Sequence, residues 1–173
     1  SVRTAGTVTL ISNITLNGDL NVKQGTFSIN NGTARRINLV IGGNLNVDAP
    51  GAIVTGTGGT NTTTNPLGIT GSTNGFLNYY ELESHRIQVY GDFTNNGSVK
   101  FTNLTYPVYN QLASDGFATV YFNGSSDRTL TCSGPTIFYN LVVDKGSDQT
   151  YKLTINSSDY SNFRLYGANI AEG

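Results

Sequence analysis

The sequence predicts an all-β protein of the solenoid class, and the first observation behind this prediction is the alternation in residues 37–47 (INLVIGGNLNV). Successive side chains of an extended strand point to opposite faces. One face of this segment would then be apolar, and the other would carry mostly amide side chains. The apolar row consists of Leu39, Ile41, Gly43, Leu45 and Val47.

The second observation is that this segment recurs along the chain. Residues 14–22 (ITLNGDLNV) carry the same pattern, each 25 positions before its counterpart, as for Ile14 and Leu39 (39 − 14 = 25). Residues 87–95 (IQVYGDFTN) carry it again 48 positions later (87 − 39 = 48), which is nearly two further periods. A strand unit that recurs about every two dozen residues is typical of a solenoid.

The third observation is the composition. The 173 residues include 21 Gly, no Met, and Glu only at positions 81, 83 and 172. Asn, Thr and Ser crowd the segments between apolar pairs, which favours strands and turns over helices. The length fits one continuous core, so we expect residues 1–173 to form a single solenoid segment.

Charge and hydropathy argue against two classes of partner. The 10 basic and 11 acidic residues are scattered and give a net charge of −1, so no basic stripe is available for a phosphate backbone. We therefore expect no nucleic acid partner. No run of about 18 apolar residues is present, so we expect no membrane span either. Because the chain begins at Ser1 without a leader, we interpret it as a piece of a longer repeat protein.

The first third of the chain predicts strands in a regular order. Residues 2–10 alternate and predict an opening strand. After the first repeat, Phe27 and Ile29 are echoed 25 positions later by Ala52 and Val54, which predicts two strands per coil with one common spacing.

The pattern then breaks. Residues 56–75 are polar and rich in glycine, and such a stretch cannot bury enough apolar area to offset the entropy of ordering it. We predict one long loop excursion there, with a short return strand at Leu67 and Ile69 as an alternative. Residues 76–86 (FLNYYELESHR) follow and concentrate aromatic and charged side chains. As a strand, this segment would place on one face Tyr79, Glu81, Glu83 and His85.

A second family of repeat is predicted from residue 118 onward. Residues 118–123 (ATVYFN) and 129–133 (TLTCS) alternate as strands, and further runs stand at 136–146 (TIFYNLVVDKG) and 151–156 (YKLTIN). The closing residues 164–170 (RLYGANI) look like another copy of the opening element.

The glycine in the middle of each apolar row has a physical interpretation. A residue without a side chain allows the strand to bend from one sheet of a coil to the next. The Asn and Asp residues beside it suit a corner because their side chains bond local backbone groups. If the coils stack, the Asn residues would form amide ladders along the axis.

These residues resemble a known family. Residues 120–146 (VYFNGSSDRTLTCSGPTIFYNLVVDKG) look like a unit of large secreted and surface repeat proteins of Bacteroidota, in which FNG and a T-rich strand precede SG and TxFxNLxVxK. The segments NGDLNV, IGGNLNV and VYGDFTNNGSV are similar to the units that accompany it.

The resemblance implies a right-handed parallel β-helix, exported by the type IX route, in a long adhesin-like or filament-forming protein. It carries over no catalytic residues. One departure is Cys132, which stands where the family usually has an aliphatic residue. We interpret Cys132 as a small buried side chain rather than a reactive thiol.

The acidic residues offer weak candidates for catalysis. Asp19 and Asp92 occupy like positions in the repeat and would line up on one outer face, but Asp next to Gly is ordinary turn chemistry. Polysaccharide lyases and hydrolases need clustered carboxylates or a base at the scissile bond, and Glu81, Glu83 and His85 are the best such group. We interpret these three as the solvated charged face of a strand rather than as a catalytic site. No metal-binding spacing is present, so we expect neither a metal site nor a cofactor.

The sequence therefore predicts an extracellular structural or adhesin-like module, a stalk or filament segment without catalysis of its own. Its expected partners are neighbouring coils or domains of the same protein, surface glycans, or further copies in a filament. The alternative is a carbohydrate-binding or polysaccharide-degrading β-helix with a groove near residues 76–92. Aromatic faces stack on sugars, so the candidate ligand-binding residues are Tyr79, Tyr80, Glu81, Glu83, His85 and Tyr90.

Overall fold

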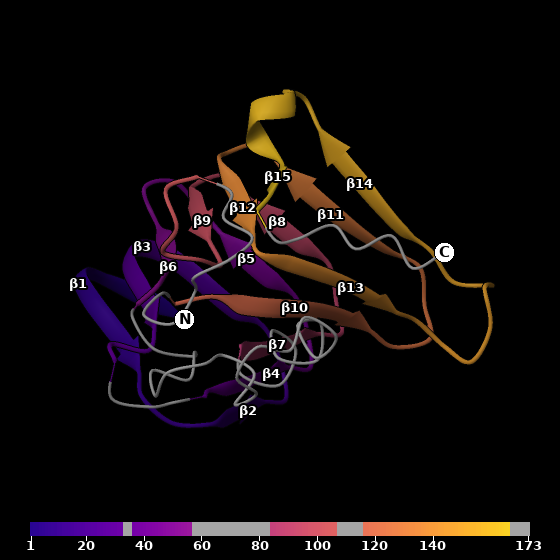
Figure 1. Ribbon diagram of the computed structural model, residues 1–173, viewed down its shortest axis with the longest axis horizontal. Helices are drawn as coiled ribbons and strands as arrows, with labels where there is room; N and C mark the ends of the chain where they lie inside the picture. The colour runs from indigo at the N-terminus through magenta and orange to yellow at the C-terminus, as the bar shows by residue number, and fades with distance from the viewer. Residues whose placement is uncertain (33–35, 57–83, 107–115, 167–173) are drawn as a thin grey trace, which may run out of the picture.

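The computed structural model describes residues 1–32, 36–56, 84–106 and 116–166 (Figure 1). Within these ranges the chain forms fifteen β-strands and one short 3₁₀ helix, η1 (Tyr160–Asn162). Every pairing between two of these strands is parallel. Residues 57–75 of the predicted excursion, and residues 76–83 after it, lie outside the described part of the chain.

One sheet has five strands, which we call the first ladder, and its spatial order follows the chain. Apolar residues alternate along these strands and turn one face toward the core. The strands are β2 (Ile14–Leu16), β4 (Asn38–Ile41), β7 (His85–Val89), β10 (Ala118–Asn123) and β13 (Asn140–Asp144).

The other sheet has ten strands and consists of two ladders that share β3 (Leu20–Ile29). The second ladder continues from the first half of β3 through β5 (Leu45–Val47), β8 (Phe93–Asn95), β11 (Arg128–Cys132) and β14 (Leu153–Ser157). The third ladder continues from its second half through β6 (Ala52–Thr55), β9 (Ser98–Lys100), β12 (Thr136–Phe138) and β15 (Arg164–Leu165). The opening strand β1 (Val2–Leu10) pairs with both halves of β3.

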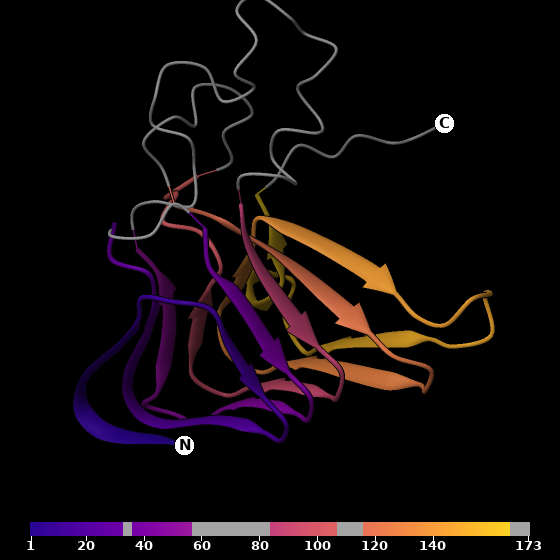
Figure 2. The same ribbon diagram turned by 90° about the horizontal axis from the view of Figure 1, so that it is seen from below.

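The chain passes through the ladders in turn, so each turn of the chain lies on the one before. Figure 2 shows these turns side by side, from β1 at one end to β14 at the other. Leu39, for example, pairs with Ile14 of the preceding turn and with Ile87 of the following one. The all-β prediction is confirmed, and the parallel stacked sheets are compatible with a β-solenoid.

Side chains at equivalent positions form columns inside the stack. One column of the second ladder consists of Leu20, Leu45, Phe93, Leu130 and Ile155. The middle of the stack is aromatic, since the Phe93 ring centroid lies 6.4 Å from that of Phe122 and 6.0 Å from that of Phe138. Most of the buried apolar residues form one core, and Cys132 is among them, as predicted.

The corner glycines occur where the predicted bends lie, and close stacking is the reason for them. Gly43 and Gly91 stand between the first and second ladders in successive turns. A Cβ added at Gly91 would lie 2.5 Å from the carbonyl oxygen of Gly43. The backbones of successive turns are therefore too close at this corner for any side chain.

Two details of the predicted spacing are wrong. Phe27 pairs with Ile53 and not with Ala52, because the corner between the second and third ladders has one residue more in this turn than in the turn before. The 48-residue step from Leu39 to Ile87 is one turn and not two, since β4 pairs directly with β7. The pairing of two strands is set by the stacking of their side chains in columns. The number of residues that connect the two strands can therefore differ from turn to turn.

The predicted second family of repeat continues the same stack, because β10, β11 and β12 pair with β7, β8 and β9 in the same three ladders. One interpretation of the C-terminal half is wrong. Within the closing segment, Arg164–Leu165 pairs with β12 in the third ladder, whereas the predicted copy of the opening element would start in the first. Residues 167–170 of that segment lie outside the described part.

Candidate binding surfaces

His85 was predicted to lie on an outer face, and the structure places it in the interior. It is fully buried and opens the inward row that continues to Ile87 and Val89. Its Nδ1 accepts a hydrogen bond from the backbone N–H of Ile37 at 2.9 Å, and its Nε2 lies 3.5 Å from Nδ2 of Asn30. An accepting Nδ1 carries no proton, so the imidazole is not doubly protonated in this arrangement.

Tyr90 is the one predicted ligand-binding residue that the described ranges place at the surface. It follows β7, is partly exposed, and its carbonyl oxygen accepts a hydrogen bond from Nε of Arg128 at 2.9 Å. The other four candidates, Tyr79, Tyr80, Glu81 and Glu83, lie outside the described residues. The structure thus separates His85 from Tyr90, one facing the core and the other the solvent.

Asp19 and Asp92 do line up along one corner, with Asn44 between them. The Oδ1 atom of Asp19 accepts from the backbone N–H of Asn44 at 2.7 Å, and that of Asn44 accepts from the N–H of Asp92 at 2.8 Å. Oδ1 of Asp92 in turn accepts from the N–H of Thr129 at 2.9 Å. Each side chain therefore fixes the corner of the next turn, which is the turn chemistry expected from Asp and Asn beside Gly.

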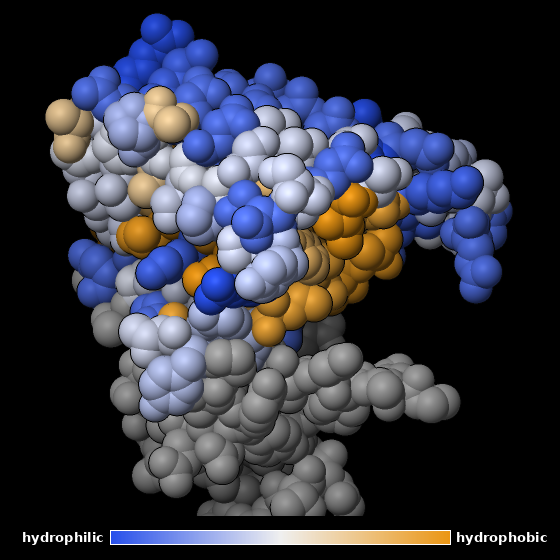
Figure 3. All heavy atoms as spheres, turned by 90° about the horizontal axis from the view of Figure 1, so that it is seen from above, coloured by the Kyte–Doolittle hydropathy of each residue, from blue (hydrophilic) through white to orange (hydrophobic). Residues whose placement is uncertain are grey.

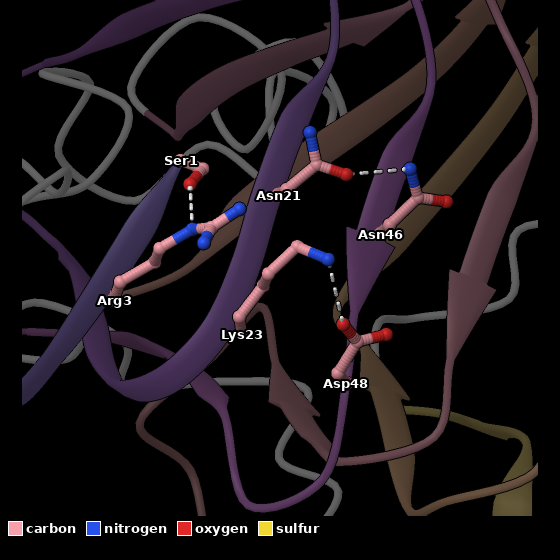
Figure 4. A network of polar contacts seen from close by, with 6 residues as sticks. All are labelled: Ser1, Arg3, Asn21, Lys23, Asn46 and Asp48. Atoms are coloured by element: carbon pink, nitrogen blue, oxygen red, sulfur yellow. Dashed lines mark hydrogen bonds and ion pairs between the residues drawn. The ribbon is translucent and has the colours of Figure 1, made fainter.

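Amide ladders run along the outer faces, as expected from the stacked Asn residues. On the second ladder Asn46 Nδ2 donates to Asn21 Oδ1 at 2.9 Å, and beside it Lys23 lies 3.5 Å from Asp48 across the same two turns (Figure 4). On the first ladder Asn123 Nδ2 donates to Gln88 Oε1 at 3.1 Å. These bonds tie neighbouring turns together on the solvent side.

Asn95 and Lys145 are two of the buried polar residues that the sequence pattern did not single out. Asn95 takes an inward position between Val47 and Cys132, and its Nδ2 donates to the Pro135 carbonyl oxygen at 3.0 Å and to Thr136 Oγ1 at 2.8 Å. Its motif, TNNG, shows the signal that was available: an Asn at the inward parity of a strand. The network closes the corner between two turns.

Lys145 is the second of these residues. Its Nζ donates to the carbonyl oxygen of Asn123 at 3.0 Å, at the end of β10. Burial and then the positive charge of Arg128 lower the pKa of this ammonium group, while the carboxylates of Asp127 and Asp92 act in the opposite direction. Lys145 holds the ends of two first-ladder strands together.

A shallow depression of about 410 Å³ lies beside β11 and β14. Its lining is Thr131, Cys132, Ser133, Ile155, Asn156, Ser157 and Ser158. The lining contains neither an aromatic ring on which a sugar could stack nor a carboxylate or imidazole for proton transfer. Within the described ranges, no group of three or more His, Cys, Asp or Glu side chains is placed to hold a metal ion.

Comparisons with known proteins give no match. No protein-family model, no curated protein and no solved structure is similar to this chain at a significant level. Among the described segments there is also no helix of the length and hydropathy that a bilayer crossing requires.

Proposed function

We propose that this chain is a right-handed parallel β-helix that serves as an extracellular structural or adhesin-like module, with no catalysis of its own. The single observation that carries the proposal is the stack itself: three parallel ladders share one core, and their outer polar groups bond to the next turn. Such an arrangement resists bending because neighbouring turns share both backbone pairing and side-chain contacts.

The proposed right-handedness is supported by a general rule. Connections between parallel strands of one sheet are right-handed in about 98% of cases, because a twisted strand returns onto its sheet only that way. The extracellular location and the type IX export route rest on the resemblance of residues 17–22, 41–47, 89–99 and 120–146 to Bacteroidota repeat units. A surface protein of this kind would contact glycans or neighbouring domains through its outer faces.

The absence of catalysis is supported by the placement of the described polar groups. Asp19 and Asp92 hold corners, and His85 faces the core. The alternative, a sugar-binding or sugar-degrading groove near residues 76–92, has in Tyr90 one exposed described residue. Retention or cleavage of a polysaccharide in the following experiment would support this alternative.

The test is a panel of bacterial, algal and plant polysaccharides incubated with the purified chain, scored for retention and for release of reducing or unsaturated ends. We expect no release. Release that disappears in Glu81→Gln or Glu83→Gln but persists in Asp144→Asn, a matched acid-to-amide control at an exposed position of β13, would refute the structural proposal. Retention without release would identify an adhesin-like surface, and the same Gln variants together with Tyr90→Ala would show whether it lies near residues 76–92.

A further inference from the structure

Three inward columns of the stack end on exposed aliphatic side chains at the last turn. Phe122, Leu130 and Phe138 are 0% exposed. Their respective partners in the last turn are Val143, which is 53% exposed, Ile155, which is 45% exposed, and Leu165, which is 51% exposed. Figure 3, which views the molecule from the side of η1 and β14, shows apolar side chains gathered in a patch on this end. We call the part of this surface that β14 and β15 form the C-terminal end face.

The opposite end of the stack shows the same feature. Val8 on β1 and Ile14 on β2 are 40% and 41% exposed, although both belong to inward columns that are buried one turn later. Leu10 on β1 is partly buried and starts the neighbouring column. We call this surface the N-terminal end face. The backbone edges of β1 and of β14 and β15 carry no further strand among the described residues.

We propose that the N-terminal end face of one copy of this chain binds the C-terminal end face of another, with β1 of the first copy pairing in parallel with β14 and β15 of the second. The inference rests on the proposed function, since it supplies the way in which such modules would assemble. The same face does not meet itself, so the contact is head to tail and generates a linear filament rather than a closed dimer.

The register of the columns sets which side chains meet. The column of Val8 runs through the third ladder to Thr136, and the next position in the last turn is Phe163. The column of Leu10 ends on Leu165 in the same way. One further turn of the stack would therefore set Val8 of one copy on Phe163 of the other, and Leu10 on Leu165. Both pairs are apolar, and all four side chains are at least partly exposed at present.

Charge at the corner between the second and third ladders is complementary. Arg3 is exposed and pairs with Gln24 at this corner of the first turns. Asp159 is exposed at the same corner of the last turn, between β14 and β15. In the stacked arrangement the guanidinium of Arg3 would lie over the carboxylate of Asp159, and opposite charges at that distance attract.

The first ladder takes a smaller part in the contact. β1 occupies the second and third ladders, whereas the first ladder begins one turn later with β2. In the first ladder, β13 of one copy and β2 of the next would therefore be separated by the width of one strand. Val143 on β13 is as exposed as Leu165 but lies under this gap, which makes it a matched control.

Sedimentation velocity over a series of protein concentrations tests the proposal. We expect the wild type and Val143→Lys to form larger species as concentration rises, and Val8→Lys and Leu165→Lys to remain monomeric. An equimolar mixture of the two monomeric variants should give a 1:1 heterodimer and nothing larger, because each variant retains one intact face. Formation of that heterodimer also shows that both variants are folded.

Several outcomes would overturn the proposal: a wild type that is monomeric at every soluble concentration, a Val8→Lys variant that still dimerises, or a Val143→Lys variant as defective as Leu165→Lys. If a Lys variant loses its far-UV circular dichroism, Arg3→Glu replaces it, since Arg3 is exposed. That variant should weaken association, and an unchanged profile would refute the register. A monomeric wild type would leave the polysaccharide panel, and hence the proposed function, unaffected.

Discussion

Truncation of Leu130 and of Ile155, which face each other in consecutive turns of one column, should have very different effects on stability. Leu130 is 0% exposed and Ile155 is 45% exposed. Leu130→Ala removes three buried carbon groups at about 0.8 kcal/mol each, or about 2.4 kcal/mol of transfer free energy. The cavity left among the neighbouring turns raises the expected loss to about 3–5 kcal/mol.

Ile155→Ala removes as many carbon atoms from a site that is already half open to water. Roughly half of the transfer free energy is lost, and no closed cavity forms, so the expected loss is about 1 kcal/mol. The difference between the two variants should thus be at least about 2 kcal/mol. Urea unfolding at low protein concentration measures it, provided the slope of free energy against urea is the same for both variants.

Equal losses for the two variants would refute the reasoning. Such a result would mean that another segment covers Ile155 in solution, or that the two residues do not belong to one column. Amide hydrogen exchange gives an independent check, because β14 at the end of the stack should exchange faster than β11 inside it.

Three further predictions concern the corner, the thiol and the buried histidine. Gly91→Ala should lower the free energy of unfolding by about 1–3 kcal/mol, because its Cβ would meet the backbone of the preceding turn. Gly18→Ala at the equivalent corner should be neutral or stabilising, because nothing lies within 4 Å of the added Cβ. Chemical denaturation of both variants tests this. Burial raises the pKa of the Cys132 thiol above its ordinary value of 9.0, so the thiol ionises at lower pH in the unfolded chain than in the native one. The free energy of unfolding should therefore fall as pH rises above 9.0, and it should fall less steeply in Cys132→Ala. The native thiol should react with an aromatic disulfide only when the chain unfolds. His85→Leu should cost at least about 1–3 kcal/mol, since it leaves the buried N–H of Ile37 without this acceptor, and a thermal midpoint equal to that of the wild type would contradict the hydrogen bond.

Local pattern was enough to predict the all-β class, the 25-residue spacing of the first turns, the corner positions of Gly43 and Gly91, and the burial of Cys132. Each of these depends on alternation along a strand or on the chemistry of one corner, and both are written in adjacent residues. The interior position of His85 was also available, since it has the same parity as Ile87 and Val89. The concentration of charged residues just before it obscured this signal.

The tertiary structure alone decided how the turns pair and which apolar side chains remain exposed. Sequence separation does not measure distance along the stack, so a step of 48 residues and a step of 25 both amount to one turn, as β4 shows with β7 and with β2. Exposure likewise depends on whether another turn follows. Leu130 and Ile155 are alike in chemistry and in strand parity, and only the turn above Leu130 makes it part of the core. Strand alternation is a property of neighbouring residues, whereas burial in a stack is a property of neighbouring turns.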